Sequence, residues 1–225
     1  MKKIYNWGKG TVFDIEADGL LDEATKLHVL SYNLVGRTGH IRGEELDRMV
    51  KFFEWHIEKE IPVVGHNIID YDIPLVEKLL GVDLSKLMCI DTLYLSYYLN
   101  YDRPAHGLGS YGEKVEIEDW EGLTFEEYKD RCDVDVKLNK EVWEDMQEQL
   151  VDMYSIAKNE IDGGNVGGKR LEGEELYIDS YKDSSTVTEY VDRILTYLMF
   201  KADKARLRVE TKWEVDVPKL LALEE

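Results

Sequence analysis

The pattern of hydrophobic and polar positions predicts strands first and an alternation of helices and strands afterwards. Short apolar or β-rich stretches, typical of strands, cover residues 11–16, 26–35, a segment around 40–41, 61–65 and 88–90. Apolar residues at helical spacing predict helices over residues 44–60, 73–80, 91–99, from 123 to about 153 and from 186 to about 209. An antiparallel set of strands followed by this alternation is typical of a mixed sheet with helices on its faces. We therefore expect an α/β fold.

A glycine-rich run marks the clearest break in the chain. Residues 162–168 read Asp-Gly-Gly-Asn-Val-Gly-Gly, which is typical of either a hairpin tip or a flexible loop. Residues 1–153 are expected to form one domain. Residues 154–225 are expected to form an appendage that contains this loop or hairpin and the last long helix.

Composition narrows the class of protein. The 225 residues include 47 acidic and 28 basic side chains, a formal net charge of −19, which argues against tight binding of nucleic acid or anionic lipid through a broad basic face. Two cysteines are too few for a disulfide framework, and neither a signal peptide nor a membrane span is evident in the sequence. A cytoplasmic protein is the expectation, in the host cytoplasm if the source is viral.

Two acids stand together on the first predicted strand. Asp14 and Glu16 are two residues apart, and side chains at this spacing leave a strand on the same face. Neighbouring carboxylates repel each other unless a cation or a set of hydrogen-bond donors compensates them. The pair therefore indicates either a metal-binding site or a solvated strand edge.

Two later segments carry further acids. In His-Asn-Ile-Ile-Asp-Tyr-Asp, which ends at Asp72, the last residue is either a functional acid or the N-cap of the following helix. In Arg-Cys-Asp-Val-Asp, Asp133 and Asp135 lie in the helix predicted from residue 123. The apolar spacing of that helix does not single out one of the two.

Together, these segments resemble the three exonuclease motifs of the DEDD superfamily. The matching strings are Asp-Ile-Glu-Ala-Asp-Gly-Leu-Leu from Asp14, His-Asn-x3-Tyr-Asp from His66, and Cys-x2-Asp-Val-x-Leu-Asn from Cys132. They look most like the 3′–5′ proofreading domain of family A bacteriophage DNA polymerases, over roughly residues 10 to 150, and Cys-Ile-Asp-Thr-Leu from Cys89 adds to the likeness. The resemblance implies a ribonuclease H-like fold.

The resemblance also implies a metal site. In the family, the acids that match Asp14, Glu16, Asp72 and Asp135 hold two divalent ions, Mg²⁺ or Mn²⁺, and hydrolysis releases a nucleoside monophosphate from a 3′ end. The acid that matches Asp14 bridges both ions. Asp135 is favoured over Asp133 because a valine, an aliphatic residue and an asparagine follow it in the family's register.

One position departs from the family pattern. A tyrosine four residues before the last acid, or a histidine five before it, orients the attacking water in the family, but this chain has Arg131 and Asp130 there. Arginine does not act as a general base. Either Tyr128 reaches the site, or Arg131 replaces the tyrosine by contacting phosphate, or the activity is weak.

Three further residues are candidates for substrate contact. Leu20 matches the family's apolar wedge against the terminal base, although it could equally be a core leucine. Asn67 is a candidate to hydrogen-bond the nucleotide or only its own turn. His106 is a candidate for substrate contact or a structural role.

The resemblance implies a two-metal 3′–5′ exonuclease that acts on single-stranded DNA 3′ ends. Proofreading is the expected role, with a DNA polymerase as the partner, because the chain is too short to contain a polymerase as well. Two alternatives remain open, namely a 3′–5′ exoribonuclease of the same superfamily and a catalytically weakened module that docks on a polymerase.

Overall fold

The secondary structure follows the predicted order. The structure is a computed structural model that describes residues 3–112, 123–162 and 186–210. Its strands are β1 (Thr11–Ala17), β2 (Leu27–Leu34), β3 (Arg37–Arg42), β4 (Val63–Gly65) and β5 (Cys89–Asp91). Its helices are η1 (Trp7–Lys9), α1 (Leu46–Lys59), α2 (Asp72–Leu80), α3 (Thr92–Leu99), η2 (Leu108–Ser110), α4 (Phe125–Asp162) and α6 (Val187–Glu210). The glycine-rich run predicted as a loop or hairpin lies almost entirely outside these residues.

The five strands form one mixed sheet in the order β3-β2-β1-β4-β5. Strands β1, β2 and β3 pair antiparallel, whereas β4 and β5 add to β1 in parallel. Parallel neighbours need a crossover connection, and α1 and α2 supply these crossovers. The predicted α/β class is confirmed, and the mixed sheet flanked by helices is compatible with a ribonuclease H-like fold.

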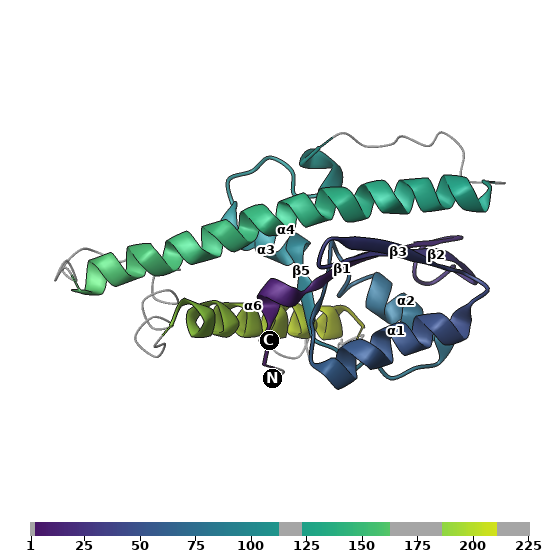
Figure 1. Cartoon of the computed structure of the whole chain (residues 1–225), viewed down its shortest axis with the longest axis horizontal. Helices are drawn as coiled ribbons and strands as arrows, with labels where there is room; N and C mark the ends of the chain where they lie inside the picture. Colours follow the sequence, from purple (N-terminus) through teal and green to yellow (C-terminus); the bar gives the residue numbers. More distant parts are fainter. Residues whose placement is uncertain (1–2, 113–122, 163–185, 211–225) are drawn as a thin grey trace, which may run out of the picture.

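Successive side chains of β1 point to opposite faces of the sheet. Phe13 and Ile15 pack in the apolar cluster that contains Met49 and Phe53 of α1. Val12 points to the opposite face, where α4 lies, and Asp14 and Glu16 share that face because they follow at intervals of two. Figure 1 shows α4 crossing one face of the sheet while α1 and α2 lie on the other.

Helix α4 is longer than predicted. We expected it to end at about residue 153, but it continues to Asp162. Beyond the sheet it runs beside α6, and Tyr154 meets Tyr190 with ring centroids 5.4 Å apart. The second half of α4 therefore buries an apolar stripe against α6, which explains why the helix continues beyond the sheet (Figure 1).

Helix α6 packs into the same apolar cluster as the sheet. Tyr190 and Ile194 are fully buried there together with Val64 of β4 and Ile90 of β5. The predicted stripe on this helix is thus its buried side. The predicted domain boundary at residue 153 falls inside α4, and the division into two domains stays a prediction.

Within the described residues, no helix is both long and apolar enough to cross a membrane.

Truncating Ile194 tests how firmly α6 is joined to the sheet. Ile194→Ala is expected to lower the free energy of unfolding by about 2–5 kcal/mol, because it opens a cavity in a cluster shared with β4 and β5. Chemical denaturation followed by circular dichroism measures this change. Tyr197→Ala, on the exposed side of the same helix, is the control and should change stability by less than about 1 kcal/mol. Equal effects of the two substitutions would contradict the packing described.

Candidate metal site

Three acids from two elements meet on the α4 face of the sheet. Carboxylate oxygens of Asp14, Glu16 and Asp135 all lie within 4.8 Å of one another. Asp14 and Glu16 come from β1, opposite Ser31 and Val29 of β2, and Asp135 comes from α4. The strand edge is not solvated, because Glu16 is only 8% exposed. This spacing allows a divalent ion to bind oxygens from more than one of these acids.

Asp72 is the fourth acid at the site. It is 3% exposed, and its negative charge is close enough to raise the pKa of Asp14. Its Oδ1 atom is buried with no hydrogen-bond partner among the described residues. The N-cap of α2 is Tyr71, so the alternative reading of Asp72 as a helix cap is wrong. A buried carboxylate oxygen without a donor is the kind of group that a cation stabilises.

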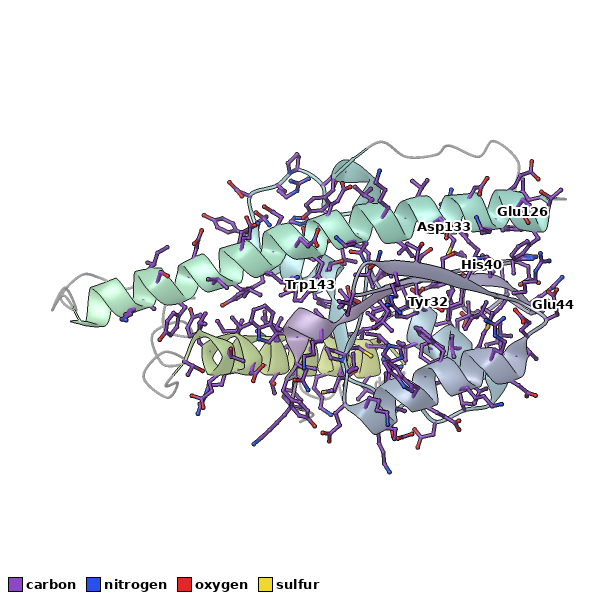
Figure 2. All side chains as sticks on the ribbon, viewed as in Figure 1. Tyr32, His40, Glu44, Glu126, Asp133 and Trp143 are labelled. Atoms are coloured by element: carbon purple, nitrogen blue, oxygen red, sulfur yellow. The ribbon has the colours of Figure 1, made fainter. Side chains whose placement is uncertain are left out.

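Helix phase separates Asp135 from Asp133. Asp133 and Asp135 are two residues apart on an α-helix, so their side chains point about 200° apart and only one of them can face Asp14. Asp133 accepts a hydrogen bond from Ser31 Oγ at 2.6 Å and pairs with Lys129 at 2.9 Å. Figure 2 shows Asp133 on the part of α4 that crosses the sheet. The structure thus brings Asp135, and not Asp133, to the other acids.

Burial and mutual repulsion disfavour negative charge at this site. Burial, and then the charges of Asp72, Glu16 and Asp135, hold the pKa of Asp14 well above its usual range. Burial raises the pKa of Asp72 to about 8, with a further contribution from the charge of Asp91. The pKa of Glu16 rises to about 7, again mainly through burial, although Arg131 opposes the shift. A bound cation would reverse these shifts by favouring the ionised carboxylates.

The donor set suits a hard divalent ion. All four groups offer carboxylate oxygens, which Mg²⁺ and Mn²⁺ prefer. A sulfur also lies close by, since Cys132 Sγ is 3.4 Å from Asp14 Oδ2. Burial, followed by the charges of Asp14 and Glu16, raises the pKa of the Cys132 thiol well above its usual range. The other donors are all carboxylate oxygens, a set that favours a hard ion such as Mg²⁺ or Mn²⁺ over zinc.

Arg131 contacts the carboxylates directly. Its Nε donates to Glu16 Oε1 at 2.8 Å, and its Nη2 lies 3.9 Å from Asp135 Oδ2. Tyr128 is 6% exposed and stacks on His28, with ring centroids 3.9 Å apart. The charge of Glu16 nevertheless contributes to a raised pKa of Tyr128, which means that the phenol lies near the cluster.

Leu20 lies on an anchored loop beside the acids. It is 73% exposed, so the alternative of a core leucine is wrong. Lys78 Nζ donates to the carbonyl oxygens of Leu21, Asp22 and Ala24 at 2.7–3.0 Å, and Tyr71 Oη donates to Gly19 O at 2.7 Å. Asp18 accepts from the backbone nitrogens of Thr25 and Lys26. The loop therefore holds an apolar side chain in water.

The other two substrate candidates have structural partners. Asn67 adopts φ of 68°, and its backbone N–H donates to Asp91 at 2.9 Å. The ring of His106 lies 2.6 Å from Ser96 Oγ and packs on Tyr97, both on α3. The site prediction for these two residues stays a prediction.

Sequence reasoning missed the role of Asp91. This fully buried acid accepts hydrogen bonds from the backbone nitrogens of Asn67, Ile69 and Leu93, each at 2.9 Å. It thereby caps α3 and also fixes the turn that leads to Asp72. The signal was an aspartate directly before an apolar helical run, which is a common N-cap pattern. Asn139 lies one helical turn after Asp135 on α4. Its side chain accepts a hydrogen bond from Thr92 Oγ1 at 2.7 Å and so links α4 to the start of α3.

Comparison with known proteins gives a likeness of fold and no family. No protein-family model matches the chain, and no curated protein matches it either. A solved structure described as the apo form of a nuclease aligns with a TM-score of 0.51 at 14% identity, covering 92% of this chain and 89% of that one. Brucella melitensis NrnC bound to pGG aligns with a TM-score of 0.49 at 14% identity, covering 88% of this chain and 90% of that one. The first likeness shows that the chain shares the fold of a solved nuclease.

The raised pKa values predict how the stability of the metal-free protein depends on pH. Unfolded carboxyl groups lose their protons near pH 4, whereas Glu16 and Asp72 in the folded protein lose theirs at about 7 and about 8. Between these limits the folded state binds more protons than the unfolded state, so the free energy of unfolding should fall as pH rises from about 4 to about 8. Denaturant titrations in a chelating buffer at several pH values measure this slope.

Two substitutions test the cause of that slope. Asp72→Asn removes one titrating group and should flatten the slope, leaving the variant more stable than the wild type at pH 8 by at least about 1 kcal/mol. Asp152→Asn removes an exposed carboxylate from α4 and should keep the wild-type slope. If Asp72→Asn also kept that slope, the buried carboxyl group would not be the cause.

Proposed function

We propose that this chain is a metal-dependent 3′–5′ exonuclease that removes nucleoside monophosphates from single-stranded DNA 3′ ends. The observation that carries the proposal is the convergence of Asp14, Glu16 and Asp135 within 4.8 Å, with the unpartnered buried oxygen of Asp72 beside them. The fold shared with a solved nuclease supports it. Membership in the DEDD superfamily rests on the resemblance of the three motifs.

Asp14, Glu16, Asp72 and Asp135 would hold the metal, as two Mg²⁺ or Mn²⁺ ions. Such ions supply an activated water and stabilise negative charge on the phosphate oxygens during hydrolysis. The residues themselves set the orientation of the reacting groups. Asp91 fixes the turn before Asp72, and β1 fixes the spacing between Asp14 and Glu16. The fold therefore sets the positions of these carboxylates before substrate binds.

Leu20 supports the assignment to an exonuclease acting at a strand end. An exposed leucine on an anchored loop offers an apolar surface for a nucleobase but no charge for an internal phosphate. Its loop is tied to Tyr71, the residue that precedes Asp72. A terminal base packed on Leu20 would therefore lie beside the carboxylates.

The second candidate is a catalytically weakened module that docks on a DNA polymerase. The pairing of Arg131 with Glu16, at the position where the resembling family has a tyrosine, favours it. The polymerase partner and the proofreading role rest on the resemblance alone and stay predictions. A preference for RNA over DNA is the remaining alternative within the enzyme class.

A cleavage assay tests the proposed activity. Purified protein with Mn²⁺ and a 3′-labelled single DNA strand should release labelled mononucleotide, and a chelator should abolish the release. Asp14→Ala and Asp135→Ala should each lower the cleavage rate by more than about 100-fold. Losing a residue that only supports a metal ligand typically costs roughly 10- to 100-fold, and losing the ligand itself should cost more. Asp133→Ala, two residues away on the same helix, is the matched control and should cleave within about threefold of the wild-type rate.

Three results would redirect the proposal. Faster cleavage of an RNA strand of the same sequence would favour the exoribonuclease. No cleavage of either strand at any metal concentration would favour the docking module. Equal losses in Asp133→Ala and Asp135→Ala would contradict the choice of Asp135 over Asp133 as a metal ligand.

Removing the side chain of Leu20 tests its role at the strand end. Leu20→Ala should raise KM for a single-stranded 3′ end by about three- to tenfold, because packing part of a leucine side chain against a base is worth about 1 kcal/mol. Its effect on kcat should be smaller, since the residue touches no reacting atom. Steady-state kinetics measure both constants. Leu46→Ala, an exposed leucine on α1 at the other face of the sheet, should change neither constant, and an equal rise in KM there would contradict the role of Leu20.

A further inference from the structure

A cation that belongs to the chain already lies among the carboxylates. The Arg131 Nε atom is 2.8 Å from Glu16 Oε1, and Nη2 is 3.9 Å from Asp135 Oδ2. The side chain of Glu16 is 10% exposed and that of Arg131 25% exposed. Two of the four acids proposed to hold metal are thus engaged by one guanidinium.

This ion pair competes directly with a divalent ion. An N–H···O bond between charged groups at 2.8 Å is short and strong, and it occupies a lone pair of the oxygen that a metal would use. Arginine does not lose its proton in proteins. A divalent ion that bound through Glu16 Oε1 and Asp135 Oδ2 would have to displace Arg131.

Asp72 and Asp14 are placed differently. The Oδ1 atom of Asp72 is buried with no hydrogen-bond partner among the described residues, and Asp14 Oδ2 lies 3.4 Å from the thiol of Cys132. Buried acids without a protein cation gain the most from a metal ion. The pair Asp14 and Asp72 should therefore bind a metal ion more tightly than the pair Glu16 and Asp135.

We infer that Arg131 is a built-in counter-ion that holds the position of the second divalent cation between Glu16 and Asp135. This inference rests on the proposed function of the same site. In the protein without nucleic acid, the cluster binds one divalent ion tightly, through Asp14 and Asp72. A second ion binds weakly because it must displace the guanidinium.

The displaced guanidinium would meet the substrate. Its planar fork matches the geometry of a phosphate group, and it is partly exposed to solvent in the free protein. A DNA phosphate near the acids gives Arg131 an alternative anion, so substrate and second ion assist each other's binding. Arg131 then couples metal loading to the presence of a strand end.

Counting bound Mn²⁺ in the absence of nucleic acid tests the inference. Calorimetric titration of the metal-free wild type should show one tight and one weak ion. Arg131→Met keeps the aliphatic volume and removes the competing cation, so the second ion should bind at least about tenfold more tightly, as expected from the loss of one charged hydrogen bond. Lys129→Met is the matched control, because it removes one positive charge from the same helix at a residue that pairs with Asp133. It should bind Mn²⁺ as the wild type does.

The outcomes separate this inference from the proposed function. Indistinguishable titrations of wild type and Arg131→Met would overturn the inference while leaving a two-metal nuclease intact. No Mn²⁺ binding by either protein would overturn both. If Arg131→Met does not fold, Arg131→Lys replaces it. Lysine keeps the positive charge but lacks the planar guanidinium, so this variant should bind the second Mn²⁺ more tightly than the wild type does. An unchanged second ion in Arg131→Lys would also overturn the inference.

Discussion

Repulsion among buried carboxylates is the constraint on which the site depends. Asp14, Glu16, Asp72 and Asp135 crowd into a small volume that is largely shielded from water, and each raises the cost of ionising its neighbours. A fold can carry such a cluster only if the surrounding structure holds the acids together at a net cost in stability. The scaffold described above supplies this support through hydrogen bonds to the backbone and one internal cation. Sites with stored electrostatic strain of this kind are often functional sites.

The support comes from elements distant in sequence. Strand β1 carries Asp14 and Glu16, α2 begins at Asp72, and α4 carries Asp135 over the sheet. Asp91 ties the turn before α2 to the start of α3, and Asn139 on α4 bonds to Thr92. Because α6 packs against α4 and β5 in one cluster, the C-terminal part of the described chain contributes to the same framework. The geometry of the acids therefore depends on most of the fold.

Some of this arrangement could be predicted from the sequence. The shared face of Asp14 and Glu16 follows from strand alternation alone, and the order of strands and helices follows from hydrophobic spacing. The distinction between Asp135 and Asp133 could not be made from apolar spacing, because it depends on the Ser31 hydroxyl of β2 donating a hydrogen bond to Asp133. The length of α4 was underestimated for a similar reason, since its second half is stabilised by α6, which is distant in sequence. The exposure of Leu20 was unpredictable because Lys78 anchors its loop from another element.

The hydrogen bonds that hold the Leu20 loop do not depend on pH in the same range as the charge of the acids beside it. Lys78 is bound by carbonyl oxygens, which do not titrate, and hydrogen bonds from Thr25 and Lys26 lower the pKa of Asp18 to about 2. Glu16, by contrast, gains a proton at about pH 7. In the metal-free protein, mild acidification therefore neutralises Glu16 without releasing the loop. Under the proposed function, the loop offered to a strand end would keep its shape at a pH at which the metal-free site has lost negative charge.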